Sequence, residues 1–424
     1  MRVLHVLHRS MPALSGYSIR TSYITRFQQK LGIEPYAVTS AQHPFDDVMH
    51  EVIDGVEFLR THPLTGKLYP GVRELRLMRA LQKRVHEAIG RWKPDLIHAH
   101  SPVLVGLPAL VEARRNRLPI VYEVRDLWEN ASVDRGKFGY DSPQYKAARG
   151  LETQVFRHAD AVVVICEALR AELAPRVGKR TQLHVVGNGV DAAAFEPVAE
   201  AQHVRERLGL AGKRIVGYLG TFQPYEGLDC LVEAMPQVLE QMPNAHCVIT
   251  GGTDQALERR AAELGITEHV TFTGRVPHDQ VRDMYSIADV MVYPRRSTRT
   301  TELTTPLKPL EAMALAKPVI ISDVQAMLEL VRANETGLIF RAGDSSDLAA
   351  KIATILSDPA RAKTLGKQAR TWIEQQRDWA ELVPKYVDIY RSLIAPKGES
   401  AATTQSRDSS ARPSRTDGRR GSSK

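Results

Sequence analysis

The stretch that most constrains the fold lies at residues 288–323. Residues 288–293 and 318–322 are short apolar runs, which is typical of buried strands in a parallel sheet. Between them lie a polar loop and a short apolar segment, residues 310–316, with the composition of a helix. Strand, loop, helix and strand form a βαβ unit, and such sheets bind ligands at the carboxyl ends of their strands. The polar loop is therefore the predicted ligand site.

This loop carries groups that suit a diphosphate and a ribose. Thr304, Thr305 and Leu307 offer backbone N–H groups beside a predicted helix N-terminus, where anions bind. Lys308 adds a positive charge. Glu311 falls on the first helical turn, where its carboxylate can accept two hydrogen bonds from a ribose diol. The plainer interpretations are an ordinary acid at a helix N-terminus for Glu311 and a solvated surface lysine for Lys308.

The run of residues 306–314, with residues 317–323 after it, resembles the donor-sugar motif of the family-4-type retaining glycosyltransferases of GT-B fold. The resemblance covers nearly the whole chain except its tail. In detail the chain is similar to the glycosyltransferases associated with exosortase A and PEP-CTERM exopolysaccharide gene clusters. Of the family's two motif glutamates, Glu311 matches the second. Leu303 stands at the place of the first, with Glu302 beside it.

The alternation of buried strands and helices predicts an α/β fold, and the length of 424 residues suits two domains. The resemblance implies GT-B architecture, in which two Rossmann-like domains face each other across a cleft. The expected boundaries are 1–186 for the acceptor domain and 187–378 for the nucleotide-sugar donor domain. A terminal helix at 379–395 is expected to pack back on the N-terminal domain. Residues 396–424 are rich in Ser, Thr, Arg and Gly and are expected to form a disordered basic tail.

A glycine loop follows the first strand of each expected domain. The resemblance places Gly16 and Gly220 where the backbone approaches the donor's diphosphate; a simple turn glycine is the alternative for Gly16. Most family members carry an arginine and a lysine in the second loop, and this chain has Thr221 and Glu226 there. The Thr221 hydroxyl and backbone N–H groups remain for the diphosphate. Unless donor binding is weak or lost, the missing positive charge must come from Lys308 or from arginines of the same loop: Arg295, Arg296 and Arg299.

Two histidines lie on the predicted strand that ends at residue 100. The resemblance implies that His100 hydrogen-bonds the donor sugar near the reaction centre, and a structural histidine is the plainer alternative. His98 is expected to point to the opposite side of the strand and to be packed. Arg275, after Gly274, matches a family loop that packs against the nucleotide base, so this side chain is expected to stack on the base or to be exposed.

The next strand, residues 119–124, runs into a polar loop that resembles the acceptor side of the family's cleft. Arg125 and Asp126 can form a structural ion pair, or they can line the acceptor pocket with Trp128 or Tyr122 stacked on a sugar ring. Both interpretations stand equally at this point. Residues 130–145 are expected to form a mobile loop over the acceptor side.

Residues 72–92 are predicted to form an amphipathic helix with one apolar stripe and a basic face. The expected stripe contains Val72, Leu75, Met78, Leu81, Val85, Ile89 and Trp92. A core-facing helix with a solvated basic face is one interpretation. The other is peripheral contact with anionic membrane lipids, which would suit a lipid-linked acceptor.

Composition excludes several classes of protein. Of the net charge of +8, residues 397–424 carry +4 (seven basic and three acidic residues), so the rest of the chain is only mildly basic and no nucleic-acid partner is expected. Three widely spaced cysteines match no zinc or disulfide pattern and predict buried free thiols in a reducing cytoplasm. With no apolar run of membrane-spanning length and no signal peptide, the chain is expected to be cytoplasmic, or peripheral on the inner face of the cytoplasmic membrane.

The resemblance implies a hexosyltransferase that moves a sugar, with retention, from a nucleotide diphosphate sugar to a hydroxyl of a lipid-linked exopolysaccharide intermediate. A UDP sugar is the expected co-substrate. No other cofactor and no metal ion are expected, since the chain has no Asp-x-Asp motif, and no carboxylate pair of the glycosidase type stands out. Two other functions fit the same fold: a non-hydrolysing nucleotide-sugar epimerase, and a non-catalytic partner subunit.

Overall fold

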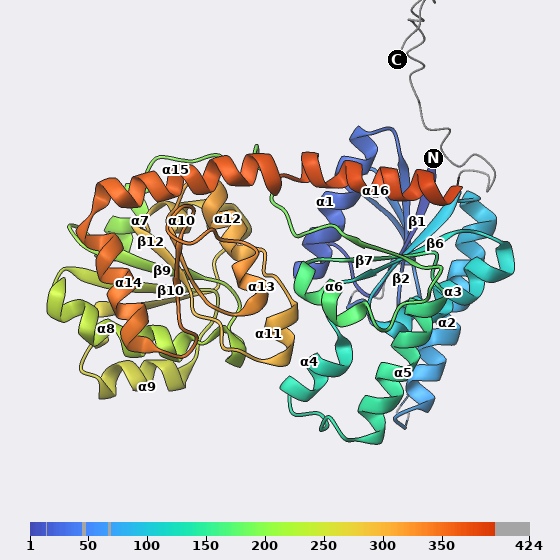
Figure 1. Cartoon of the computed structure of the whole chain (residues 1–424), viewed down its shortest axis with the longest axis horizontal. Helices are drawn as coiled ribbons and strands as arrows, with labels where there is room; N and C mark the ends of the chain where they lie inside the picture. Colours follow the sequence, from blue (N-terminus) through green and yellow to red (C-terminus); the bar gives the residue numbers. More distant parts are fainter. Residues whose placement is uncertain (14, 45–47, 67–68, 395–424) are drawn as a thin grey trace, which may run out of the picture.

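The computed structural model describes residues 1–13, 15–44, 48–66 and 69–394, which contain two α/β units, each built on its own sheet (Figure 1). The first sheet has eight strands in the order β3-β4-β2-β1-β5-β6-β7-β8, and the second has six in the order β11-β10-β9-β12-β13-β14. All strand pairs are parallel except β3 with β4. The predicted α/β fold of two Rossmann-like units is confirmed.

The first unit contains β1 to β8 and α1 to α6. Its strands are β1 (Arg2–Leu7), β2 (Glu34–Thr39), β3 (His50–Ile53), β4 (Val56–Arg60), β5 (Leu96–His100), β6 (Ile120–Val124), β7 (Ala161–Val164) and β8 (Gln182–Val185). Its helices are α1 (Gly16–Lys30), α2 (Val72–Trp92), α3 (Val103–Asn116), α4 (Trp128–Asp134), α5 (Pro143–His158) and α6 (Glu167–Leu173). The central strands β5 and β6 are buried along their whole length, as helices on both faces of a parallel sheet require.

The second unit contains β9 to β14 and α7 to α15. Its strands are β9 (Arg214–Leu219), β10 (Ala245–Thr250), β11 (Val270–Gly274), β12 (Val290–Tyr293), β13 (Val319–Ser322) and β14 (Leu338–Phe340). Its helices are α7 (Gln202–Arg207), α8 (Leu228–Gln241), α9 (Gln255–Glu263), α10 (Val281–Ser286), α11 (Arg299–Leu303), α12 (Lys308–Ala314), α13 (Gln325–Leu328), α14 (Ser345–Ser357) and α15 (Pro359–Gln376). Single 3-10 turns cover Pro224–Glu226, Thr267–His269 and His278–Gln280.

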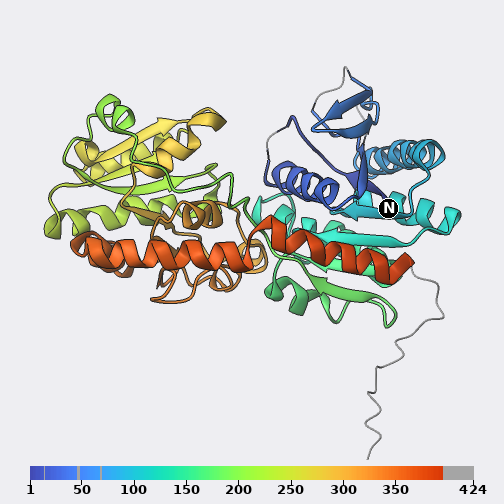
Figure 2. The ribbon, with the colours of Figure 1, turned by 90° about the horizontal axis from the view of Figure 1, so that it is seen from above.

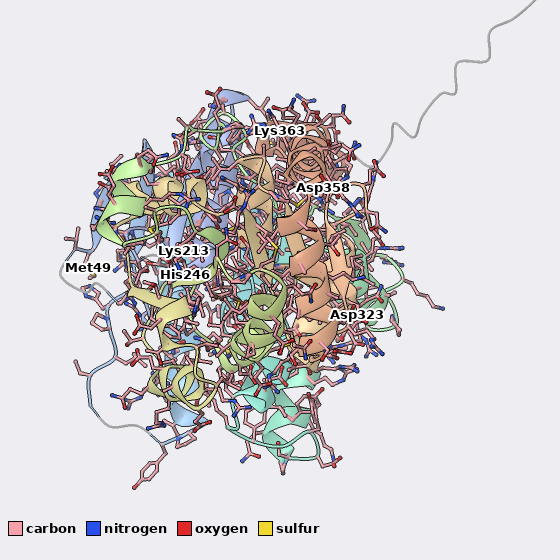
Figure 3. All side chains as sticks on the ribbon, turned by 90° about the vertical axis from the view of Figure 1, so that its left-hand side faces the viewer. Met49, Lys213, His246, Asp323, Asp358 and Lys363 are labelled. Carbon is pink, nitrogen blue, oxygen red and sulfur yellow. The ribbon has the colours of Figure 1, made fainter. Side chains whose placement is uncertain are left out.

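The last two helices join the units. Asp358, labelled in Figure 3, caps the N-terminus of α15, because the Asp358 carboxylate accepts a hydrogen bond from the Arg361 N–H at 2.9 Å. α16 (Trp379–Ile394) then crosses to the first unit and lies along it (Figures 1 and 2). Its apolar side chains share one buried cluster with residues of β1 and α1, so the expected return of the C-terminal helix is confirmed.

The connection between the units is narrow. Two glycines, Gly187 and Gly189, lie in this connection, and neither has a positive φ. Close packing explains both glycines: a Cβ on Gly187 would lie 1.9 Å from a guanidinium nitrogen of Arg377, and one on Gly189 would lie 2.7 Å from the Arg377 carbonyl. The chain therefore passes tightly between Arg377 and α16.

Helix ends of each unit are capped by the other unit. Asp134, at the end of α4, accepts hydrogen bonds from the Thr298 hydroxyl at 3.1 Å and the Thr300 N–H at 3.0 Å, at the start of α11. Glu329, just after α13, accepts from the N–H groups of Glu167 and Ala168 at 2.9 Å each, at the start of α6. These contacts hold the two units together on one side of the connection.

Two predictions in the first unit are wrong in detail. The buried residues of α2 are Leu77, Leu81, Val85, Ala88 and Trp92, whereas Val72 and Leu75 are about half exposed, because the first turns of the helix extend past the sheet. Residues 130–145 are partly helical, since α4 runs to Asp134 and α5 begins at Pro143.

Two further predictions can be compared with the structure directly. The three cysteines are free and buried, as predicted. Among the described residues, no helix is long and apolar enough to cross a membrane. The expected tail, residues 396–424, lies outside the described residues.

Candidate active site

The predicted ligand loop joins β12 to β13, with two short helices in place of the single helix expected. Thr298 caps α11, and Leu307 precedes α12, so Lys308 is the first helical residue. The apolar side chains of α12 are buried, whereas Lys308 and Glu311 stay partly exposed on its other face. The helix thus presents both charged side chains at the carboxyl end of β12, as the loop pattern predicted.

Lys308 belongs to a buried charge cluster with Glu226 and Arg295. Arg295 donates to Glu226 through Nη2 at 2.9 Å and Nε at 3.3 Å, and the Lys308 Nζ lies 3.7 Å from the same carboxylate. Burial alone would raise the pKa of Glu226, but the charges of Arg295 and Lys308 hold it below its usual value. Burial lowers the pKa of Lys308, against the opposing charge of Glu226. In this cluster one carboxylate faces two cations, and the negative charge of Glu311 also acts on Lys308.

Gly220 makes room for this lysine. A Cβ on Gly220 would lie 2.0 Å from the Lys308 Nζ and 2.3 Å from its Cε. The Nζ passes over the glycine and reaches the Tyr218 hydroxyl at 3.3 Å, at the carboxyl end of β9. The glycine loop and the β12–β13 loop therefore meet at Lys308. This lysine brings a positive charge next to Glu226 of the glycine loop.

The other residues predicted to bind the nucleotide-sugar donor fall into two groups. Arg296 and Arg299 are engaged elsewhere, since Arg296 pairs with Asp229, and Arg299 pairs with Glu172 of the first unit at 2.9 Å. Thr221 and Arg275 are exposed, and the Thr221 carbonyl accepts a hydrogen bond from the Tyr218 hydroxyl. Arg295 and Lys308 are thus the basic side chains that the structure brings together, among the described residues of this loop.

Threonines of the ligand loop support its shape. The Thr304 carbonyl accepts a hydrogen bond from Arg295 Nη1 at 3.1 Å, and the buried Thr304 hydroxyl has no hydrogen-bond partner among the described residues. Thr305 is buried, and its carbonyl accepts from Asn188 Nδ2 at 2.7 Å, in the connection between the units. Arg295 and Asn188 therefore hold the backbone of the loop from both sides.

Glu311 faces the first unit. Its carboxylate accepts a hydrogen bond from the Tyr285 hydroxyl at 2.9 Å. The pKa of Tyr23, on α1 of the first unit, is raised by burial and then by the negative charge of Glu311. Glu302 has a different role, because its carboxylate accepts from the Gln325 N–H at 2.8 Å at the start of α13. Glu311 is the motif carboxylate that lies toward the opposite unit.

The first unit contains a buried network of ion pairs and hydrogen bonds around Glu123, at the end of β6. Glu123 is fully buried and pairs with Arg125 Nε at 2.6 Å and Arg20 Nε at 3.1 Å. Burial alone would raise the pKa of Glu123, but the two arginines hold it well below its usual range. Arg125 is thus paired with Glu123, and no Arg125–Asp126 ion pair is found among the described residues, so the first of the two interpretations of this loop, a structural ion pair of these two residues, is wrong.

The ring of His100 is enclosed in this network. It is 1% exposed; its Nδ1 lies 2.6 Å from Arg125 Nη2 and its Nε2 lies 3.1 Å from His5 Nδ1. His98 lies on the same side of β5 and stacks on His100 with ring centroids 4.2 Å apart. The expectation that His98 points to the opposite side is wrong, because side chains two residues apart share a face of a strand. Burial lowers the pKa of both rings, which are therefore neutral.

Three neutral histidines close together raise the question of a metal ion. The candidate ligand atoms of His5, His98 and His100 lie within 4.8 Å of one another. Their ring nitrogens, however, are used within the network, because Arg125 Nη2 donates to His100 Nδ1 and His100 Nε2 lies at hydrogen-bond distance from His5 Nδ1. The charges of Arg20 and Arg125 also oppose a cation there. These residues do not fit a metal site.

The acceptor side is formed by residues beside this network. Asp126 is partly exposed and hydrogen-bonds the Tyr17 hydroxyl; burial raises the pKa of both groups. Trp128 is partly exposed and packs edge-on against Phe138 at 6.1 Å. Tyr122 cannot stack on a sugar, since it is fully buried and its hydroxyl bonds Glu152.

The acceptor-side helix α4 contacts the donor loop, because Asp134 at its end accepts hydrogen bonds from Thr298 and Thr300. Burial raises the pKa of Tyr225, in the second glycine loop, against the positive charge of Arg295. Gly16 is exposed, and an added Cβ would meet nothing within 4 Å. The fold itself therefore imposes no glycine at position 16, and any need for one comes from a ligand.

Several site residues were not found from the sequence. Glu123 is a charged residue within an apolar strand, whereas Arg20, Tyr285 and the tyrosines of α16 lie among other polar residues. A charged residue buried in a strand needs a partner, which is a signal for Glu123. The partners lie far apart in the chain, so the network itself is visible only after folding.

Comparison with known proteins identifies both units. Residues 15–189 match the model of the glycosyl transferase 4-like domain, and residues 200–372 match the model described as glycosyl transferases group 1. The GDP-mannose-dependent alpha-(1-6)-phosphatidylinositol monomannoside mannosyltransferase of Mycolicibacterium smegmatis is 30% identical over 238 residues, which are 55% of this chain and 62% of that protein. The sulfoquinovosyl transferase SQD2 of Arabidopsis thaliana is 28% identical over 381 residues, 88% of this chain and 69% of that protein. The chain thus spans less than two thirds of the mycobacterial relative.

Solved structures share the fold. Sucrose-phosphate synthase from Thermosynechococcus elongatus superposes with a TM-score of 0.76 at 24% identity, covering 93% of this chain and 100% of that chain. HepE of Anabaena, in complex with UDP, gives a TM-score of 0.68 at 19% identity over the same shares of the two chains. Since the two family models match the two sheet-containing units in turn, the chain belongs to the family-4-type glycosyltransferases of GT-B fold.

Proposed function

We propose that the protein transfers a hexose from a nucleotide diphosphate sugar to a hydroxyl of a glycan, with retention of the anomeric configuration. One observation carries the proposal: Lys308 and Arg295 share the Glu226 carboxylate at the carboxyl ends of β9 and β12, so two cations lie there against one buried acid. That is where open α/β sheets bind nucleotides. Glu311, on the next helical turn, suits the ribose diol.

The charges explain how transfer would be accelerated. Breaking the bond between sugar and phosphate builds negative charge on the diphosphate and positive charge on the sugar ring. A fixed lysine and oriented N–H groups of the loops at Gly16, Thr221 and residues 304–307 stabilise that negative charge without reorganisation. Asp126 and Trp128 orient the acceptor, whose proton passes to the leaving phosphate.

The same proposal gives His100 an indirect role. Both of its ring nitrogens lie within hydrogen-bonding distance of protein groups, His5 and Arg125. We assign His100 to holding Arg125, whose Nη1 donates to the Tyr17 carbonyl at 2.6 Å, at the start of α1. The ring thereby supports the loop beside Gly16 and Asp126.

The proposed co-substrate is a UDP sugar, and the proposed acceptor is a lipid-linked exopolysaccharide intermediate, as in the exosortase-associated enzymes that the sequence resembles. The mycobacterial relative is GDP-mannose-dependent, so GDP sugars are the first competing donors to test. No metal ion or other cofactor enters the proposed reaction.

Product analysis tests the proposal. The protein is incubated with UDP, GDP and ADP hexoses and a lipid-linked acceptor, with and without chelator, and the anomeric configuration of the product is read by NMR. We expect one donor to give a retained product in both conditions. Sugar conversion without acceptor would identify an epimerase, and no turnover of any donor would favour a non-catalytic partner.

The membrane contact is a separate part of the proposal. Arg73, Arg76 and Arg79 are exposed on α2, close to the half-exposed Val72 and Leu75. Basic and apolar side chains together suit an anionic lipid surface. Co-flotation with anionic but not zwitterionic vesicles is expected, and its loss on replacing the three arginines by glutamate identifies the surface.

A further inference from the structure

Two buried tyrosines contact the first turn of α12, the helix that carries Lys308 and Glu311. Tyr285 of α10 donates a hydrogen bond to the Glu311 carboxylate at 2.9 Å, and Tyr293 of β12 donates one to the Lys308 carbonyl at 3.0 Å. The two tyrosines are 0% and 1% exposed. One hydroxyl therefore holds the backbone of this turn, and the other holds its carboxylate.

The direction of the hydrogen bond from Tyr285 is fixed by chemistry. A phenol has one proton, and an ionised carboxylate can only accept. The Lys308 carbonyl is a second acceptor, but it is neutral and lies farther from the Tyr285 hydroxyl, at 3.4 Å. Burial, and then the negative charge of Glu311, raise the pKa of Tyr285 well above its usual value, so the hydroxyl keeps the proton that it donates.

The position of Tyr285 is also fixed relative to the far end of α12. Lys317, which follows this helix, donates hydrogen bonds to the carbonyls of Ser286 and Ala288 at 2.6 and 3.0 Å. Ser286 is the last residue of α10 and the neighbour of Tyr285. The Tyr285 ring itself belongs to the apolar core of the second unit. The Tyr285 hydroxyl is thus a rigid donor beside the flexible side chain of Glu311.

The proposed role of Glu311 requires such a donor. Its side chain is partly exposed and long, so the carboxylate would have more orientations without the Tyr285 hydroxyl. A diol binds more tightly to a carboxylate that is already oriented, because less freedom is lost on binding. We infer that Tyr285 is a positioning residue that sets the preference of the nucleotide site for ribose, because its hydroxyl orients the Glu311 carboxylate. This inference rests on the proposed function, in which Glu311 binds the ribose diol.

Nucleotides with and without the diol test this role. Titration calorimetry compares UDP, GDP and ADP with their 2′,3′-dideoxy counterparts, which present no ribose hydroxyl to Glu311. For the base that binds, we expect wild type to prefer the ribonucleotide about ten- to hundredfold, and Tyr285→Phe to lower the ribonucleotide affinity about tenfold, the effect of one charged hydrogen bond. The affinity for the dideoxynucleotide is expected to be the same in both proteins.

Two further variants separate positioning from a general effect on the fold. In the Glu311→Ala background, Tyr285→Phe should not lower ribonucleotide affinity further, because the tyrosine acts through this carboxylate. Tyr293→Phe is the matched control, since it removes a neighbouring buried hydroxyl that holds the backbone of the same turn. It is expected to change the affinities for both nucleotides alike and to keep the preference for ribose.

An unchanged ribose preference in Tyr285→Phe overturns the inference, and so does an equal loss of affinity for both nucleotides, which would make the tyrosine purely structural. Wild type that binds nucleotides without preferring ribose overturns the inference but leaves nucleotide binding intact. If wild type binds no nucleotide at all, the proposed function fails and the inference fails with it. Phenylalanine fills the space of the tyrosine ring, so we expect Tyr285→Phe to fold, which circular dichroism checks.

Discussion

At the scale of single residues, the positive charge of the site comes from a different sequence position than in most family members. Glu226 stands where most family members carry a lysine, and the sequence shows only the loss of that charge. The structure brings Lys308 over Gly220 to the same region and pairs Arg295 with Glu226. The sequence names Lys308 and Arg295 as candidates, but which arginine is engaged elsewhere depends on partners such as Asp229 and Glu172, which are distant in the chain.

Removing this lysine should weaken the donor complex. Lys308→Ala is expected to lower the affinity for the nucleoside diphosphate about ten- to hundredfold, the value of one charge-assisted hydrogen bond. Gly220→Ala should act in the same direction, because its Cβ displaces the Lys308 Nζ. Titration calorimetry measures both. Gly150→Ala is the matched control, since a Cβ there meets nothing, and an unchanged affinity in Lys308→Ala would refute the role.

At the scale of elements, buried carboxylates join helices to strands. Glu152 of α5 accepts the Val103 N–H at the start of α3, at 2.8 Å, and bonds the Tyr122 hydroxyl. The helices and most strands could be predicted from apolar runs and turn residues. The first turns of α2 could not, because the period of an amphipathic stripe does not tell where the sheet beneath the helix ends. The antiparallel edge strand β3 was missed for a similar reason, since its residues alternate between exposed and half-buried.

We expect the buried carboxyl group of Glu152 to make the free energy of unfolding depend on pH. Burial raises its pKa from 4.5 to about 8. Between these values the folded state keeps the proton and the unfolded state releases it, so the free energy of unfolding falls as pH rises, on the order of 1 kcal/mol per pH unit. Glu152→Gln should remove this fall in urea unfolding at pH 5 and pH 8. The exposed Glu240→Gln should keep it, and an identical slope in Glu152→Gln would show that another group is responsible.

At the scale of the whole molecule, two consecutive α/β units were predictable from the sequence, because each βαβ unit is a local pattern repeated along the chain. The arrangement of the units was not, since it depends on side chains that cap helices across the boundary. Asp134 caps α11, and Glu329 caps α6. Each unit therefore completes hydrogen bonds that the other lacks.

Loss of both caps should open the molecule. In Asp134→Ala/Glu329→Ala the radius of gyration from solution X-ray scattering is expected to increase without nucleotide, because each lost cap removes about 1 kcal/mol from the joined state. Asp358→Ala, which removes a cap within one unit, should leave the radius unchanged. Equal radii for the double variant and wild type would mean that other contacts hold the units together.

The central claim is that the β12–β13 loop binds a nucleotide sugar through the face that carries Glu311. The most direct measurement is thermal stabilisation of the protein by UDP, GDP and ADP sugars, without metal, beside the Glu311→Ala variant. A ligand at 100 times its dissociation constant should stabilise the folded state by about 2.7 kcal/mol. We expect a shift for one nucleotide that is lost in Glu311→Ala. No shift with any donor, or an equal shift in the variant, would contradict the account.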